Sequence, residues 1–173
     1  MEIILVDEKD NPVGVMNKME VHQKAILHRA FSVFIFNENT EMLLQKRAAQ
    51  KYHSAGLWTN ACCSHPKPGE ETLAAAKIRL QEEMGFCTNL VKVFDFIYQT
   101  EFENGLVEHE FDHVFIGYYN AAVFPNPDEV SEYCFMSLIE IEKSIQSNPL
   151  QYTEWFKIAF PMLQHYLDEN PVS

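Results

Sequence analysis

The feature that most constrains the fold is a pair of long stretches, rich in aromatic and β-branched residues, that are separated by one short turn. Residues 90–102 and 106–119 are predicted strands, and the turn Glu103-Asn104-Gly105 between them contains the Asn-Gly pair that is typical of a β-hairpin. Strands joined by a hairpin are antiparallel. The chain is therefore not a simple succession of strand–helix–strand units around an all-parallel sheet.

The remaining apolar patterns indicate strands and helices around this hairpin. Short apolar runs predict strands at residues 3–6, 13–17, 30–37, 42–46 and near Phe135. Helical periodicity and terminal signals predict helices at residues 19–26, 70–84, 138–147 and 152–167. Residues 48–69, polar and interrupted by glycine and proline, are predicted to form a long loop. The expected fold is a single α+β domain over residues 1–173, an α/β sandwich with a mixed sheet flanked by helices.

The charge balance bears on the partners that the chain can have. The 13 Lys and Arg residues face 25 Asp and Glu residues, for a formal net charge of −12. Such a surface repels nucleic acid and anionic membranes, so neither is expected as a partner. The apolar stretch at the N-terminus is too short for a signal peptide or a membrane span. The cysteines form no C-x-x-C motif, and we expect reduced thiols in a cytoplasmic protein.

Two carboxylates on the second predicted hairpin strand suggest a metal site. Glu108 and Glu110 are two residues apart, so they share a face of the strand. Neighbouring carboxylates repel one another unless a cation neutralises them. A solvated strand face is the alternative. With His22, His28 and His65 they would form an imidazole–carboxylate set that suits six-coordinate Mn²⁺, Mg²⁺ or Fe²⁺ better than tetrahedral zinc, although spacing alone does not show that they converge.

Several cations stand out in a chain this acidic. Arg79 lies one helical turn before Glu83 on a predicted helix, so the two side chains share a face. An ordinary salt bridge is one interpretation. The functional interpretation is a diphosphate clamp, in which cations hold the phosphate oxygens and Glu83 holds a bridging Mg²⁺. The cations of this set are Lys18, Lys46, Arg47, Lys51 and Arg79.

The polar segment at residues 58–66 carries a cysteine that could take part in chemistry. Cys63 could be a buried structural thiol, or it could exchange protons beside a metal-binding His65. Nucleophilic catalysis is less favoured, because the sequence shows no oriented base. Trp155 could be a core aromatic residue or could stabilise a cation on its ring face. The chain has no G-x-G-x-x-G, P-loop or G-x-S-x-G motif, so dinucleotide-binding folds, P-loop kinases and α/β-hydrolases are unsupported.

Three short motifs occur in a fixed order along the chain. They are His28-Arg29-Ala30-Phe31-Ser32, then Trp58-Thr59-Asn60 through Cys63-Ser64-His65-Pro66, and then Glu108-His109-Glu110. Together they resemble the type I isopentenyl-diphosphate isomerases, over a span that reaches from the first strand to Trp155. That family has a Nudix fold, and residues 80–86 resemble the second half of a Nudix box. Ile78-Arg79 stands where a Nudix hydrolase carries Arg-Glu, and Ser64 stands at the leading glycine, which argues against hydrolysis.

The resemblance implies an isomerase of isoprenoid biosynthesis that interconverts isopentenyl diphosphate and dimethylallyl diphosphate. It implies a small diphosphate as substrate and a monomer or weak homo-oligomer. The implied ligands of Mn²⁺ or Mg²⁺ are His22, His28, His65, Glu108 and Glu110, and Glu83 is the implied ligand of a second, diphosphate-bridging Mg²⁺. The implied phosphate-binding residues are Lys18, Arg47, Lys51 and Arg79. Cys63 and Glu110 are the implied proton-transfer pair, in either order, and Tyr98 and Trp155 complete the implied pocket.

Two alternatives remain open at this point. A Nudix-type diphosphohydrolase would share the metals and the phosphate clamp, but it needs an intact glutamate-rich box and a positioned water. A non-catalytic metal-binding or interaction module predicts that Cys63 and Glu110 can be replaced without functional loss.

Overall fold

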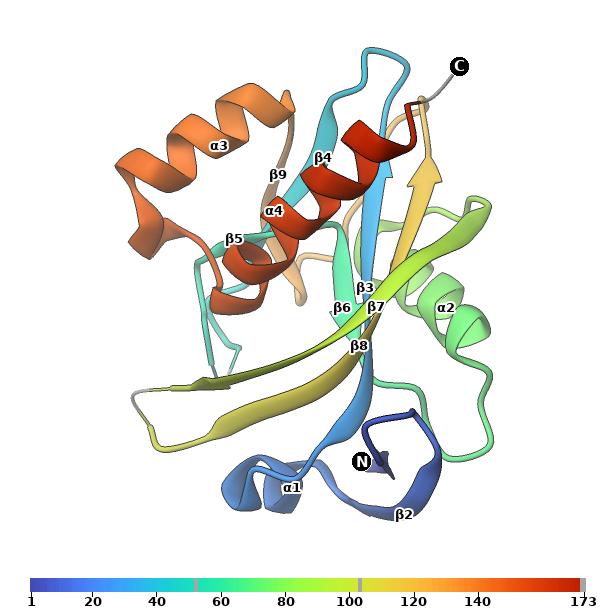
Figure 1. The fold of residues 1–173 in the computed structure, drawn as a ribbon. Helices are drawn as coiled ribbons and strands as arrows, with labels where there is room; N and C mark the ends of the chain where they lie inside the picture. Colours follow the sequence, from blue (N-terminus) through green and yellow to red (C-terminus); the bar gives the residue numbers. More distant parts are fainter. Residues whose placement is uncertain (52, 103, 172–173) are drawn as a thin grey trace.

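The computed structural model describes residues 1–51, 53–102 and 104–171, and it has one curled mixed sheet with helices on both faces (Figure 1). α2 lies on one face of the sheet, and α3 and α4 lie on the other (Figure 1). The strands are β1 (Glu2–Val6), β2 (Pro12–Asn17), β3 (His28–Phe36), β4 (Met42–Arg47), β5 (Trp58–Thr59), β6 (Cys62–Ser64), β7 (Leu90–Glu101), β8 (Val107–Tyr118) and β9 (Val130–Met136). The helices are α1 (Lys18–Lys24), α2 (Thr72–Met84), α3 (Leu138–Ser147), the 3-10 turn η1 (Pro149–Gln151) and α4 (Glu154–Glu169). The predicted α+β sandwich is confirmed.

The hairpin predicted from the Asn-Gly pair forms the longest strand pair of the sheet. β7 and β8 are antiparallel from Leu90–Gly117 to Glu101–Val107. Gly105 has φ +77, a backbone conformation that glycine adopts without strain. Glu103 of the predicted turn lies outside the described residues. β8 then pairs in parallel with β3, which makes the sheet mixed.

Side-chain alternation along β3 separates two apolar cores. Phe31, Val33 and Ile35 pack with α2, whereas Phe34 and Phe36 pack with α3 and α4. All five side chains are at most 4% exposed. Because neighbouring residues of a strand point to opposite faces, a nearly continuous apolar run is expected for a strand that is covered on both sides. β3 is therefore the central element of both cores.

The prediction of an uninterrupted loop at residues 48–69 was wrong. Trp58–Thr59 pairs with β4, and Cys62–Ser64 pairs with residues 31–33 of β3. The physical reason lies in the edge of β3 that β8 does not use. β1 pairs with this edge at His28 and β4 pairs with it at Phe36, so β6 supplies the partner in between. Buried backbone amides and carbonyls require such partners, whatever the polarity of the segment that provides them.

The helix boundaries differ slightly from the predicted ones. α2 begins at Thr72, two residues after the predicted start, and α4 begins at Glu154 after the short turn η1. The exact first and last residues of a helix are its least predictable feature, because helix ends fray and vary by one or two residues. Within the described part of the chain, no helix is both long enough and apolar enough to cross a membrane.

We expect substitution of Gly85 by alanine to destabilise the protein more than the same substitution at Gly69. Both glycines have φ near +80. At Gly85 an added Cβ would lie 2.2 Å from the carbonyl oxygen of Phe124, whereas at Gly69 no atom lies within 4 Å. Gly69→Ala should cost about 1 kcal/mol from backbone strain, and Gly85→Ala should cost more, on the order of 3 kcal/mol. Urea unfolding of both variants measures this, and equal losses would contradict the steric argument.

Candidate active site

The candidate site lies on the α4 side of the sheet, next to the apolar core on that face. Even-numbered residues of β3 and β8 face this side, because side chains alternate along each strand. The strand register pairs His28 with Glu110 and Ala30 with Asp112. Tyr98 of β7 pairs with Glu110 from the other side. Charged and polar side chains therefore line a buried stretch of the sheet where apolar residues would otherwise extend the core.

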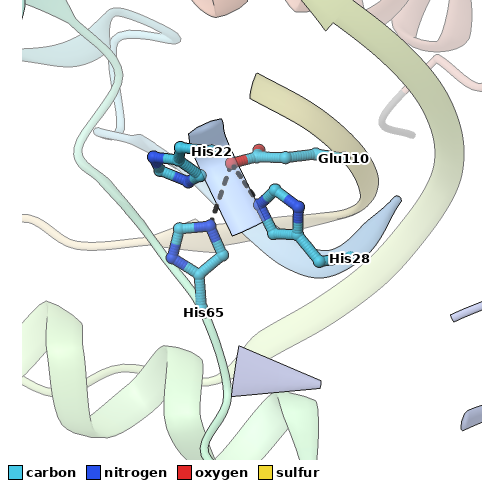
Figure 2. A group of neighbouring side chains, drawn as sticks. All are labelled: His22, His28, His65 and Glu110. Carbon is cyan, nitrogen blue, oxygen red and sulfur yellow. Dashed lines mark hydrogen bonds and ion pairs between the residues drawn. The ribbon is translucent and has the colours of Figure 1, made fainter. Parts of the chain in front are cut away.

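Three imidazoles and one carboxylate from four separate segments of the chain converge on one point (Figure 2). His22 lies in the last turn of α1, His28 begins β3, His65 follows β6, and Glu110 lies in β8. One possible ligand atom from each lies within 4.8 Å of the others, and all four residues are buried. Nε2 of His65 is 3.0 Å from Oε1 of Glu110. We refer to His22, His28, His65 and Glu110 as the metal-site group.

The hydrogen bonds of the metal-site group favour a cation at its centre. Nδ1 of His28 donates to the carbonyl of Ile26 over 2.8 Å, so Nε2 presents a lone pair to Oε1 of Glu110 at 3.6 Å. Both ring nitrogens of His22 and Nδ1 of His65 have no hydrogen-bond partner among the described residues. Burial lowers the pKa of His22 to about 4 and that of His65 to about 3. Neutral imidazoles and a carboxylate that face one another fit a divalent metal ion, which satisfies their lone pairs.

Glu108, which the motif resemblance implies as a further ligand, lies beside the metal-site group. The hydroxyl of Tyr98 is 3.1 Å from Oε2 of Glu108 and 2.7 Å from Oε2 of Glu110, so it bridges the two carboxylates. Burial, followed by the charge of Glu110, raises the pKa of Glu108. The second oxygen of Glu108 is 3.6 Å from Nε2 of His53. The predicted pairing of these glutamates on one strand face is thus observed.

His53 is a residue of the site that the sequence interpretation missed. Its ring stacks on Phe102 with the centroids 4.9 Å apart and meets Trp155 edge-on at 5.8 Å. Burial lowers the pKa of His53 to about 3, so its ring is neutral at neutral pH. His53 belongs to the segment between β4 and β5, which has no periodic pattern. The only available signal was a histidine within a polar segment that carries other candidate residues.

Cys63 faces the site, and its neighbour Cys62 does not. β6 pairs with β3 so that Cys63 lies opposite Ser32. Cys62 packs in the core under α2, whereas Cys63 packs against the core under α4. Sγ of Cys63 is 3.1 Å from Oδ1 of Asn60 and 3.4 Å from Oγ of Ser32. Burial raises the pKa of the Cys63 thiol.

Trp155, the second residue of α4, is held against the site by a hydrogen bond and by its burial. Its indole Nε1 donates to Oγ1 of Thr59 over 2.9 Å, and the residue is 4% exposed. Thr153 contacts the same hydroxyl at 3.1 Å. The guanidinium carbon of Arg47 lies 5.2 Å from the centre of the indole ring. The structure thus places one predicted phosphate-binding cation next to the predicted pocket aromatic.

A second cluster of charged residues surrounds Glu83 near the end of α2. Nη2 of Arg79 is 2.5 Å from Oε1 of Glu83, and Nε2 of Gln45 donates to Oε2 of Glu83 over 2.8 Å. Lys51 pairs with Glu129, whose Oε2 is also 3.6 Å from Nη2 of Arg79. Gln45 and Glu129 were not predicted. Both oxygens of Glu83 are engaged, and it belongs to no group of three metal ligands among the described residues, so Mg²⁺ here would need oxygens from a bound molecule.

The two remaining lysines of the predicted cation set, Lys18 and Lys46, differ in position. Lys18 lines a pocket of about 310 Å³ together with His65 and Arg79, so this pocket joins the metal-site group to the Glu83 cluster. Lys46 points to the other side of β4 and pairs with Glu132 over 2.7 Å. Side-chain alternation along β4 explains this position: Gln45 contacts Glu83, so the next residue, Lys46, faces away from the Glu83 cluster.

Comparison with known proteins places this geometry in a family. The model of the NUDIX domain matches residues 26–156. The Isopentenyl-diphosphate Delta-isomerase of Pectobacterium atrosepticum is 50% identical over 165 residues, which cover 95% of this chain and 92% of that protein. The Isopentenyl-diphosphate Delta-isomerase 2 of Photorhabdus laumondii is 53% identical over 155 residues, which cover 90% and 88%. The chain belongs to the isopentenyl-diphosphate Delta-isomerase family. The resemblance predicted from the three motifs is confirmed.

Solved structures share the fold of this isomerase-family chain. DR0079 from Deinococcus radiodurans superposes with a TM-score of 0.75 at 15% identity and covers 91% of this chain and 96% of its own. The MutT protein from Methanosarcina mazei Go1 superposes with a TM-score of 0.63 at 24% identity and covers 84% and 96%. At these identities the likeness concerns the fold alone. The Nudix fold that the family resemblance implied is confirmed.

Proposed function

We propose that this chain interconverts isopentenyl diphosphate and dimethylallyl diphosphate, the activity named for its relatives. The observation that carries the proposal is the position of Cys63 and Glu110 on one buried face of the sheet, with Trp155 packed beside them. A thiol and a carboxylate are a pair of groups that can give and take protons. A rigid aromatic wall beside them suits a cationic hydrocarbon intermediate.

The reaction requires two proton transfers at neighbouring positions. A proton adds to the terminal carbon of the alkene, whose π electrons form the new C–H bond and leave a tertiary cation. A proton then leaves the carbon on the diphosphate side, and its C–H electrons form the new double bond. One member of the Cys63 and Glu110 pair donates and the other accepts. Tyr98 holds Glu110, and the indole of Trp155 stabilises the cation while its packing excludes water.

The metal-site group, with Glu108 beside it, would hold Mn²⁺ or Mg²⁺. The donor set supports this, because neutral imidazoles with carboxylate oxygens suit an octahedral divalent ion better than zinc. When bound, the ion supplies positive charge that stabilises the carboxylates around it. Glu83 would contribute one oxygen to a Mg²⁺ that takes most of its other ligands from the diphosphate.

Four cations would anchor the diphosphate, and two of them, Lys18 and Arg79, line the pocket that joins the two clusters. Binding of a remote charged group positions a small hydrocarbon that offers few contacts of its own. Each cation is already held by a side-chain neighbour or lines the pocket, which limits the ordering cost on binding. The residues proposed for this role are Lys18, Arg47, Lys51 and Arg79.

We also infer that the chain works as a single domain in the cytoplasm, as a monomer or weak homo-oligomer. One sheet runs from β1 to β9 across the described residues, which supports one domain. The four cysteines are free, which supports a reducing compartment. The net charge of −12 favours separate molecules and disfavours nucleic acid or anionic membranes as partners.

The test of the proposed function is incubation of the purified protein with Mg²⁺ and isopentenyl diphosphate in D₂O, followed by proton NMR and a parallel assay of free phosphate. We expect dimethylallyl diphosphate that carries deuterium, without release of phosphate. Phosphate release with an unmoved double bond would instead indicate a Nudix-type diphosphohydrolase. A folded, metal-loaded protein that yields neither product would indicate a non-catalytic module.

A further inference from the structure

We propose that Ser32, held in place by Asp112, is a positioning residue that fixes the thiol of Cys63 for proton transfer. The inference rests on the proposed function, in which Cys63 exchanges a proton with the substrate. Oγ of Ser32 is 3.4 Å from Sγ of Cys63 and donates to Oδ2 of Asp112 over 2.6 Å. Ser32 and Asp112 form a buried pair beside the thiol, which we call the thiol support.

The strand register explains why Ser32 reaches the thiol. β6 and β3 are antiparallel, and Ser32 and Cys63 are direct partners, so both side chains leave the sheet on the same face. β8 runs parallel to β3 on its other edge and brings Asp112 to the same face. Ser32 thus lies between its two partners, one on each neighbouring strand. Because its one O–H proton goes to Asp112, Ser32 presents only lone pairs to the thiol and can accept from it.

A second neighbour of the thiol, Asn60, also has a fixed orientation. Asn60 donates from Nδ2 to the carbonyls of Val33 and Cys62, each over 3.0 Å. These two bonds determine which way the amide points, so its Oδ1 is the atom that faces Cys63, at 3.1 Å. Asn60 can only accept from the thiol. The single S–H proton of Cys63 therefore has two fixed acceptors, Oδ1 of Asn60 and Oγ of Ser32.

Burial of the Asp112 carboxyl lowers the stability of the folded protein, and packing alone does not explain why a carboxyl lies there. It is 1% exposed, and its Oδ1 has no hydrogen-bond partner among the described residues. A buried carboxyl with one hydrogen bond destabilises the folded protein relative to an apolar residue of similar size. In the described part of the chain, its one hydrogen-bond partner is Ser32. A role in holding the Ser32 hydroxyl against the thiol accounts for a polar group at this position.

Positioning matters here because a cysteine side chain can occupy three staggered rotamers, and only a rotamer that faces the substrate is productive. Misplacement of a reacting atom by about 1 Å can cost on the order of 100-fold in rate. The loss of one of the two acceptors should therefore lower kcat through the geometry of Cys63 and leave the binding of the diphosphate, which depends on other residues, nearly unchanged.

The test compares Ser32→Ala with Ser32→Thr, which retains the hydroxyl, and with Ser144→Ala as a matched control. Ser144 accepts a hydrogen bond from Tyr152 over 2.7 Å, away from the thiol. For Ser32→Ala we expect kcat to fall about 10- to 100-fold with KM within about twofold, and crystal structures to show Sγ of Cys63 in more than one rotamer. Ser32→Thr should restore kcat and a single rotamer, and Ser144→Ala should change neither.

Substitutions of Asp112 separate positioning from a role as a proton carrier. Asp112→Asn retains an oxygen that can accept from Ser32, so it should keep most of kcat, whereas Asp112→Ala should behave like Ser32→Ala. Equal losses in Asp112→Asn and Asp112→Ala would overturn the proposal, as would a loss of kcat in Ser32→Ala with Sγ still in its original rotamer. If the unsubstituted protein does not isomerise the substrate, the proposed function fails, and the rotamer of Cys63 in Ser32→Ala still decides whether the thiol support positions it.

Discussion

Substitution of Cys63 by alanine is expected to abolish measurable isomerisation while the protein stays folded. The thiol is one of the two groups proposed to move protons, and loss of a positioned acid or base lowers rates by about 10²- to 10⁴-fold. The thiol packs at the edge of the α4-side core, and alanine fills most of its space. The rate is measured by conversion of isopentenyl diphosphate, and the folded state by thermal unfolding.

The adjacent cysteine is the matched control for this prediction. Cys62 is fully buried on the opposite face of β6, in the core under α2. Cys62→Ala should therefore lower stability by about 1 kcal/mol, through the small cavity it leaves, and should retain most of kcat. The opposite pattern, with activity lost in Cys62→Ala and kept in Cys63→Ala, would mean that the register of β6 on β3 is wrong.

Substitution of Glu110 by glutamine is expected to remove both activity and tight metal binding. Glu110 is the carboxylate of the metal-site group and the second member of the proton-transfer pair. Glutamine keeps the shape of the side chain but cannot take up a proton or neutralise a cation. We expect kcat to fall by at least about 10²-fold. Metal analysis of the purified variant should show loss of the ion that accompanies the unsubstituted protein.

Thermal unfolding with added Mn²⁺ gives an independent test of the role of Glu110 in metal binding. An ion that binds only the folded protein stabilises it by about 2.7 kcal/mol at a concentration of 100 times Kd. This gain should be present in the unsubstituted protein and in Glu132→Gln, an exposed control on β9 that pairs with Lys46. It should be absent in Glu110→Gln. Equal stabilisation of all three proteins would place the metal elsewhere.

Much of the architecture could be predicted from local pattern. The Asn-Gly turn predicted the β7–β8 hairpin, and alternation along the strand correctly placed Glu108 and Glu110 on one face. The i,i+4 spacing of Arg79 and Glu83 predicted their contact. These predictions succeeded because each depends on residues only a few positions apart, whose relative geometry a single helix or strand determines.

Residues in segments without a periodic pattern could not be placed. His53 lies on such a segment and reaches the site only because the chain between β4 and β5 folds over Trp155. Glu129 precedes β9 and reaches Arg79 and Lys51 from a distant part of the chain. Their contacts depend on long-range packing, which local spacing does not encode.

The sequence by itself determined the elements of this protein, the shared faces within each element and, through three ordered motifs, the family. Only the tertiary structure decided that four separate segments bring the metal-site group together, and that Cys63 and not Cys62 faces it. The physical reason is the two-residue period of a strand. A shift of β6 by one residue along β3 would exchange the faces of the two cysteines, and that register is set by backbone pairing between segments about 30 residues apart in the chain.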